Sequence, residues 1–142
     1  MTRTYLDTGV LIAAVRGGFE QAEAAFRILD DPTREFVASE FLRLEILPKP
    51  TFHHRTEEQM FYEAFFESVV EWATDLTAVT QDAMIEACEH GLSAMDSLHI
   101  ASAIQLNADE FITSEKSSKP IFRTKRIQVS SSAEDTVEKK NG

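Results

Sequence analysis

Short apolar runs alternate with longer segments of helical periodicity along this chain, and this alternation constrains the fold more than any other feature. Strand-like runs lie at residues 3–7, 34–39, 76–80 and 110–113, and predicted helices separate them. Strands joined through helices pair in parallel, and the helices then cover both faces of the sheet. The alternation therefore predicts an α/β protein with three layers, α/β/α, and a mainly parallel central sheet of four to five strands. Residues 120–129 are expected to add one or two edge strands.

Capping residues and helix breakers bound the expected helices. Ser39 is the expected N-cap of one helix, which ends where Pro48 and Pro50 follow. Thr80 is the expected N-cap of another, and Gly91 its C-terminal stop. The expected helices cover residues 8–16, 20–31, 40–47, 56–76, 80–91 and 93–107.

The length of 142 residues is that of one ordinary domain. We expect residues 1–129 to form this domain and residues 130–142, which are poor in apolar side chains, to be a flexible tail. No stretch approaches the roughly 20 apolar residues of a membrane span, and the N-terminus lacks a signal-peptide core. These features predict a cytoplasmic protein without a membrane anchor. Cys88 is the single cysteine, which excludes an internal disulfide.

The formal net charge of −10 argues against a strongly basic nucleic-acid surface, since binding to phosphates ordinarily uses clustered Lys and Arg. A site built from carboxylates offers a counterweight, because bound cations would invert the local field. Composition alone therefore leaves nucleic-acid binding open.

Two carboxylates stand where their surroundings are apolar. Asp7 ends the first strand, at the edge of a parallel sheet where ligands bind, although it could instead cap the following helix. Glu45 lies on its helix one turn after Phe41 and Leu42, so it shares an apolar face. An unpaired buried carboxylate is costly, which favours a cation or strong donors beside Glu45. The alternative is a glutamate at the rim of the core.

Two further acidic residues follow later in the chain. Asp96 fits a capping box that begins at Ser93, and its helical face also carries Ile100, so the carboxylate could point to the sheet edge as well. Thr113, Ser114 and Glu115 close the strand at 110–113, where they could orient a ligand or simply begin a turn.

Histidine and the basic residues are weaker candidates. His99 follows Asp96 by three residues, and a lone helical histidine is more often a packed or hydrogen-bonded residue than a metal ligand. A basic cluster follows Glu115, and its members either hold phosphates or are solvated charges in a turn. The cluster consists of Lys116, Lys119, Arg123, Lys125 and Arg126.

Three segments taken in order, LDTGVLIAAV, SEFLRLEIL and LSAMDSLHIASAIQLNADEFITSEK, resemble the PIN-domain family, including the toxin ribonucleases of bacterial VapBC modules. The resemblance spans about residues 3–123. Its most distinctive part is D-S-L-H-I-A-S-A-I followed by A-D-E-F-I-T-S-E.

The resemblance implies that Asp7, Glu45 and Asp96 are acidic residues of the PIN site. Thr113 and Glu115 fall where the family has a Thr-x-Asp element, and Glu115 departs from it by one methylene. This departure puts metal preference and activity in question. The resemblance further implies endoribonuclease activity, an antitoxin partner and a homodimer.

An all-oxygen site of this kind suits Mg²⁺ or Mn²⁺. Asp7, Glu45 and Asp96 are the expected ligands, while Glu115 binds a second ion or positions the attacking water and Thr113 supports it. The residues expected to contact RNA are Thr8, Ser114, Lys116, Lys119 and Arg123.

Two other functions stay open on the sequence. A catalytically weak PIN scaffold that binds RNA or a protein partner without cleavage would agree with the net charge and with Glu115. An unrelated α/β domain that uses Asp7 for phosphate chemistry is disfavoured, because neither a G-x-x-x-x-G-K-[ST] loop nor a G-x-G-x-x-G turn is present.

Overall fold

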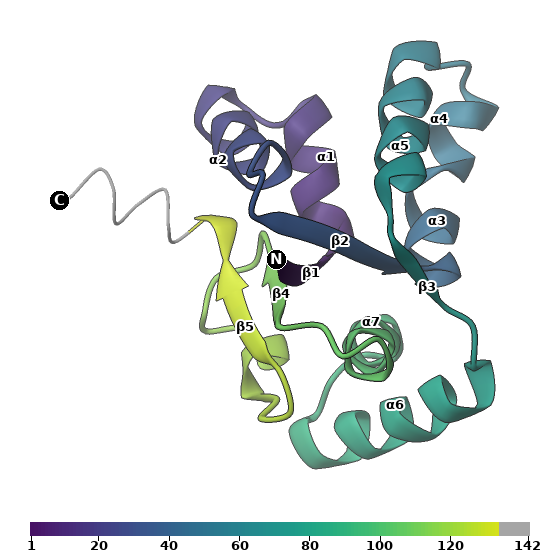
Figure 1. Cartoon of the computed structure of the whole chain (residues 1–142), viewed down its shortest axis with the longest axis vertical. Helices are drawn as coiled ribbons and strands as arrows, with labels where there is room; N and C mark the ends of the chain where they lie inside the picture. Colours follow the sequence, from purple (N-terminus) through teal and green to yellow (C-terminus); the bar gives the residue numbers. More distant parts are fainter. Residues whose placement is uncertain (134–142) are drawn as a thin grey trace, which may run out of the picture.

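The computed structural model describes residues 1–133, which form one five-stranded sheet with helices on both faces (Figure 1). All strand pairs are parallel, and the strand order is β3-β2-β1-β4-β5. The strands are β1 (Thr2–Leu6), β2 (Arg34–Ser39), β3 (Glu71–Ala73), β4 (Glu110–Thr113) and β5 (Gln128–Ser131). The predicted three-layer α/β/α class is confirmed.

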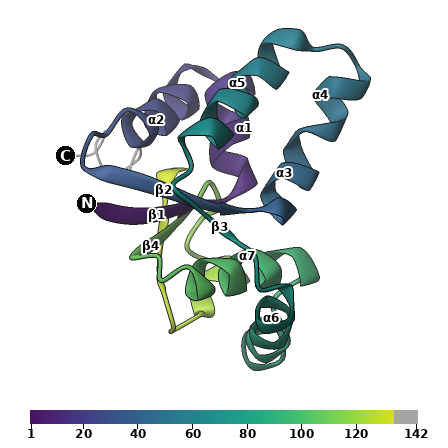
Figure 2. The same ribbon diagram turned by 45° about the vertical axis from the view of Figure 1, so that its right-hand side comes forward.

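The helices divide into two layers. One face of the sheet carries the first five helices, and the other carries α6 and α7 (Figures 1 and 2). The helical elements are α1 (Thr8–Arg16), α2 (Phe19–Leu29), α3 (Glu40–Ile46), α4 (Pro48–Phe52), α5 (Thr56–Ser68), α6 (Leu76–His90), α7 (Ala94–Gln105) and the 3-10 turn η1 (Pro120–Arg123).

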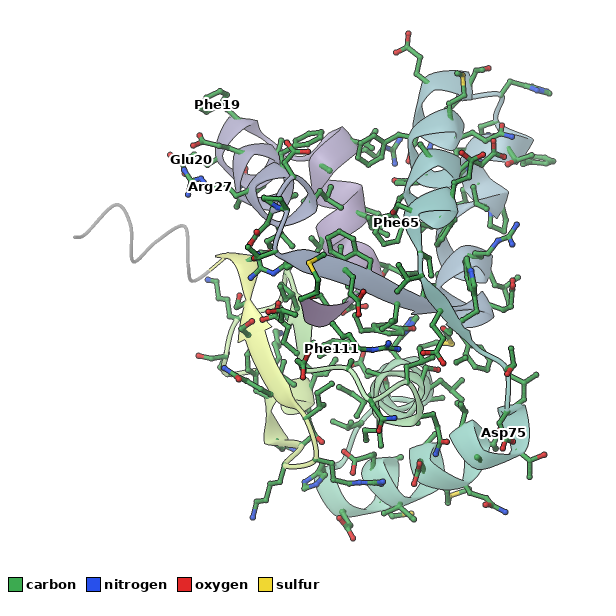
Figure 3. All side chains as sticks on the ribbon, viewed as in Figure 1. Phe19, Glu20, Arg27, Phe65, Asp75 and Phe111 are labelled. Atoms are coloured by element: carbon green, nitrogen blue, oxygen red, sulfur yellow. The ribbon has the colours of Figure 1, made fainter. Side chains whose placement is uncertain are left out.

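Each central strand supplies side chains to both layers of the core. Tyr5 and Phe111, which are in register, stack 5.4 Å apart on the α6–α7 side, whereas Leu6 and Ile112 pack among the first five helices. Figure 3 shows Phe65 and Phe111 on opposite sides of the sheet. A strand buried on both faces needs apolar residues at successive positions, which is why β1 and β4 contain apolar runs.

The third strand is not where the sequence predicted it. The expected strand at residues 76–80 is wrong, because this segment forms the first turns of α6. The strand β3 instead occupies the last part of the segment expected to be one long helix, and it pairs with β2. Thr80 is not the N-cap of α6; Asp75 is, since its Oδ1 accepts from the Ala78 N–H at 3.1 Å.

Other expected helix ends are close to those observed. The third helix ends at Ile46, and Pro48 then opens the short helix α4, because proline is compatible with a first helical position. Gly91 ends α6 in the left-handed conformation, with φ of 68°, as its position predicted.

The edge strand β5 ends at Ser131, two residues beyond the expected domain boundary at 129. The remainder of the expected flexible tail, residues 134–142, lies outside the described residues. Within residues 1–133, no helix has both the length and the apolar character that a bilayer span requires.

Candidate active site

The carboxyl ends of β1 and β4 lie side by side at the topological switch point of the sheet. The chain adds β2 and β3 on one side of β1 and then returns to add β4 and β5 on the other. Open parallel sheets leave a crevice at such a point, outside the carboxyl ends of the strands. Residues that follow β1 and β4 are therefore placed to share one ligand.

Asp7 is the first residue after β1, and its buried side chain joins the two strand ends. Its Oδ1 accepts from the Thr8 N–H at 2.8 Å, and its Oδ2 accepts from the Thr113 hydroxyl at 3.0 Å. Asp7 thus caps α1, which is one of the two roles expected for it, and also contacts β4, while its role as a metal ligand stays a prediction. Carboxylate oxygens offer about four acceptor sites in total, so Asp7 retains capacity for a cation.

The end of β4 is packed closely against the start of α1. Thr113 is fully buried, and its Oγ1 accepts from the Glu115 N–H at 3.1 Å while donating to Asp7. A Cβ on Gly9 would lie only 2.0 Å from Ser114 Oγ. Glycine at this position allows the approach that holds these residues together. The side chain of Glu115 is exposed at the rim.

Asp96 lies in the first turn of α7, where its N–H donates to Ser93 Oγ at 3.2 Å, as the capping pattern predicted. Burial raises the pKa of the Asp96 carboxyl above its usual range, and the negative charges of Asp7 and Glu115 raise it further. The tertiary structure therefore brings Asp96 close enough to both residues for their charges to interact.

Glu45 reaches the same region from α3 with a side chain about one-third exposed, at 32%. Its Oε1 accepts from Nε2 of His99, a buried residue of α7. The prediction that His99 is a hydrogen-bonded residue is confirmed. Because a carboxylate only accepts, we assign the His99 proton to Nε2.

A buried polar chain extends behind His99. The Tyr5 hydroxyl lies 2.7 Å from His99 Nδ1 and 2.7 Å from Ser39 Oγ. Burial raises the pKa of the Tyr5 hydroxyl far above its usual range, so the phenol stays protonated. Sequence analysis missed this part of the site, and Ser39 makes no side-chain capping bond on α3. The available signal was a tyrosine in an apolar strand, two residues before Asp7.

The four carboxylates are spread rather than tightly clustered. Within residues 1–133, no three of Asp7, Glu45, Asp96 and Glu115 bring ligand oxygens within 4.8 Å of one another. Like charges without a cation repel, so some spread is expected at a site for a divalent ion. The donor set consists of carboxylate oxygens, which fits Mg²⁺ or Mn²⁺.

A family model described as the PIN domain matches residues 4–119. The chain belongs to the PIN-domain family. At the level of sequence, no curated protein matches it.

Solved structures share the PIN fold over nearly the whole chain. VapBC2 from Rickettsia felis, bound to a DNA fragment from its promoter, gives a TM-score of 0.68 at 14% identity, covering 92% of this chain and 98% of that one. A toxin–antitoxin complex from Klebsiella pneumoniae gives 0.67 at 16%, with coverage of 91% and 97%. FitAcB from Neisseria gonorrhoeae gives 0.61 at 19%, also with coverage of 91% and 97%. At these identities the likeness concerns the fold.

The structure gives different surroundings to the residues expected to contact substrate, and such contact stays a prediction for each of them. Thr8 Oγ1 lies 3.4 Å from Asp7 Oδ1, and Ser114 faces Gly9. Lys116 and Lys119 are exposed in a turn closed by the Lys119 N–H and the Lys116 carbonyl, 3.0 Å apart. Arg123 is held elsewhere, since its Nη1 donates to the carbonyl at the end of α6. Its contact with substrate stays a prediction.

Proposed function

We propose that this PIN domain is a divalent-metal-dependent endoribonuclease that hydrolyses RNA phosphodiester bonds. The observation that carries the proposal is the position of Asp7 and Glu115 after the carboxyl ends of β1 and β4, with the Thr113 hydroxyl donating to Asp7 and with Asp96 of α7 near enough for the three charges to interact. Membership of the PIN family supports the same conclusion. Asp7, Glu45 and Asp96 would hold Mg²⁺ or Mn²⁺.

When bound, the ion would neutralise the carboxylates, lower the pKa of a bound water and stabilise the charge of an in-line displacement. Neighbouring side chains orient the carboxylates that would bind the ion. Thr113 holds Oδ2 of Asp7, and His99 holds Oε1 of Glu45, so both side chains are fixed before any ligand arrives. Glu115, at the exposed rim, would position the attacking water or bind a second ion.

The exposed lysines extend the proposed site toward substrate. Lys116 and Lys119 lie one and four residues after Glu115, and we propose that their ammonium groups bind phosphates on either side of the scissile bond. With a net charge of −10 on the whole chain, this local cluster would supply the attraction that the rest of the surface lacks.

We further propose that the protein is the toxin of a toxin–antitoxin pair and forms a homodimer. Several solved structures with the same fold are toxin–antitoxin complexes. Large exposed apolar side chains on neighbouring helices support a partner, because binding would remove them from water. Leu44, Phe52 and Met60, on α3, α4 and α5, are 70%, 78% and 62% exposed.

The first test is cleavage of a panel of labelled RNAs with Mn²⁺, Mg²⁺ or EDTA. The site variant is Asp7→Asn with Asp96→Asn, and the matched control is Glu57→Gln with Glu67→Gln, which removes two exposed charges from α5. We expect metal-dependent cleavage by the wild type and the control, and none by the site variant. Cleavage that persists in the site variant would refute the assignment.

A folded wild-type protein that binds RNA but cuts none with any metal would instead support the non-cleaving scaffold. The presence of Glu115 where the family has aspartate favours that alternative. The toxin role is tested by co-expression with the product of a small neighbouring reading frame. A stable complex that suppresses cleavage is expected, and full cleavage in the presence of that product would contradict the role.

A further inference from the structure

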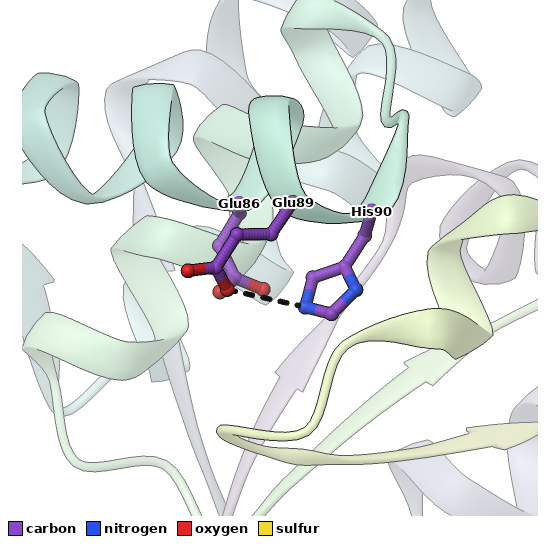
Figure 4. A group of neighbouring side chains, drawn as sticks. All are labelled: Glu86, Glu89 and His90. Atoms are coloured by element: carbon purple, nitrogen blue, oxygen red, sulfur yellow. Dashed lines mark ion pairs between the residues drawn. The ribbon is translucent and has the colours of Figure 1, made fainter.

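The C-terminal end of α6 presents three potential metal ligands on one face. Glu89 and His90 lie three and four residues after Glu86, so each of them is a neighbour of Glu86 on the helix surface. One ligand atom from each, two carboxylate oxygens and an imidazole nitrogen, all lie within 4.8 Å of one another (Figure 4). Glu89 Oε2 lies 3.7 Å from His90 Nε2.

Glu86 is the residue of this group whose buried carboxylate favours a bound cation. Its side chain is fully buried, at 0% exposure, and its Oε1 accepts from the Thr124 hydroxyl. Its Oε2 is also buried and has no hydrogen-bond partner within residues 1–133. A buried carboxylate oxygen without a donor or cation is costly, because it has lost its water without compensation.

The nearby guanidinium of Arg123 does not supply the missing hydrogen bond to Oε2 of Glu86. Arg123 lies close to the same helix end, but its Nη1 donates to the backbone carbonyl of His90 at 3.1 Å. The carboxylate of Glu86 instead lies beside the imidazole of His90 and the carboxylate of Glu89 (Figure 4).

We propose that Glu86, Glu89 and His90 bind a Zn²⁺ ion at a site separate from the carboxylate site of the PIN domain. Imidazole nitrogen together with carboxylate oxygen favours a transition-metal ion over Mg²⁺. Three protein ligands leave the fourth position of a tetrahedral ion to water. Glu89 is 62% exposed, so the ion has a route in from solvent.

The ion would have a structural role. Glu86 already joins α6 to Thr124, just after η1, and a metal on its second oxygen would tie the end of α6 to that segment. All three ligands come from α6, whereas the acidic residues of the proposed nuclease site come from β1, α3, α7 and the end of β4. The two sites can therefore be separated by mutation.

The test titrates Zn²⁺ into metal-stripped, full-length protein that carries Asp7→Asn and Asp96→Asn, so that the nuclease site does not compete. We expect one equivalent to bind and to raise the melting temperature. Adding Glu89→Gln or His90→Gln should weaken the affinity by at least about tenfold. Glu89 is exposed, so its variant is expected to fold normally, which circular dichroism checks.

Cys88→Ser is the matched control. Cys88 is an exposed thiol on the same helix and could capture Zn²⁺ on its own, so binding should survive its removal. The proposal is overturned by absence of Zn²⁺ binding, by unchanged affinity in Glu89→Gln and His90→Gln, or by loss of binding in Cys88→Ser. None of these outcomes depends on RNA cleavage.

Discussion

Replacing Gly9 with alanine tests how closely α1 is packed against the end of β4. The new Cβ would lie 2.0 Å from Ser114 Oγ and 3.1 Å from Ser114 Cβ. Relieving the first contact forces the Ser114 hydroxyl out of its present rotamer, and relieving the second requires the helix or the strand end to move. Overpacking of this kind costs roughly 1–3 kcal/mol.

The helix propensity of alanine offsets part of that cost. Alanine exceeds glycine by up to about 1 kcal/mol within a helix, and Gly9 is the second residue of α1. We therefore expect Gly9→Ala to lower the free energy of unfolding by about 1–2 kcal/mol. Urea unfolding followed by circular dichroism measures this change, and the melting temperature should fall by roughly 3–10 °C.

A double-mutant cycle with Ser114→Ala isolates the contact. Without the hydroxyl, only the Cβ contact remains, so Gly9→Ala should cost about 1 kcal/mol less in that background. An equal cost in both backgrounds, within about 0.5 kcal/mol, would show that the Ser114 hydroxyl adds nothing to the cost at Gly9 and would refute the reasoning.

Three further predictions concern the candidate site. Burial raises the pKa of Asp96, so the folded, metal-free protein takes up a proton more readily than the unfolded chain, and its stability should fall as the pH rises through the folded pKa. Urea unfolding in EDTA should show a smaller fall for Asp96→Asn, and identical pH profiles would contradict this. Tyr5→Phe removes the hydroxyl that supports His99, so we expect a loss of about 1–3 kcal/mol in stability. The Mn²⁺ concentration for half-maximal cleavage should also rise roughly ten- to hundredfold, because Glu45 is less firmly held, and an unchanged metal requirement would argue against this role. Glu115→Asp restores the shorter carboxylate of the family pattern and should increase cleavage by up to about a hundredfold, since misplacement by about 1 Å carries a penalty of that size. Initial rates on one labelled RNA measure the change, and a lower rate would show that the longer side chain is adapted to this site.

Local chemistry was sufficient to predict the fold class and several helix ends. The position of Asp7 after an apolar strand, Gly91 after a helix and Ser93 before one depend on backbone preferences that act within a few residues. The carboxyl ends of parallel strands lie at one edge of the sheet, which predicted the place of Asp7 and Glu115, whereas the full set of proposed acidic residues came from the resemblance to the PIN family.

The position of β3 could not be deduced in this way. Residues 71–73 follow a helix without a glycine or proline between them, and they become a strand because β2 offers a parallel edge. The β-branched residues within 77–80 favour a strand by propensity. They nevertheless lie in the first turns of α6, because Asp75 caps that helix and Val79 is fully buried against the core. Pairing and burial outweighed local propensity in both segments.

The sequence by itself determined the alternation of strands and helices, the helix-end residues Gly91 and Ser93 and the place of Asp7 after β1, because each depends on residues near one another in the chain. Only the tertiary structure decided which polar groups meet. The link from Tyr5 through His99 to Glu45 joins three elements, and the free oxygen of Glu86 arises from burial beside Thr124. Contacts between side chains distant in sequence, and the loss of water around them, follow from packing and leave no local pattern.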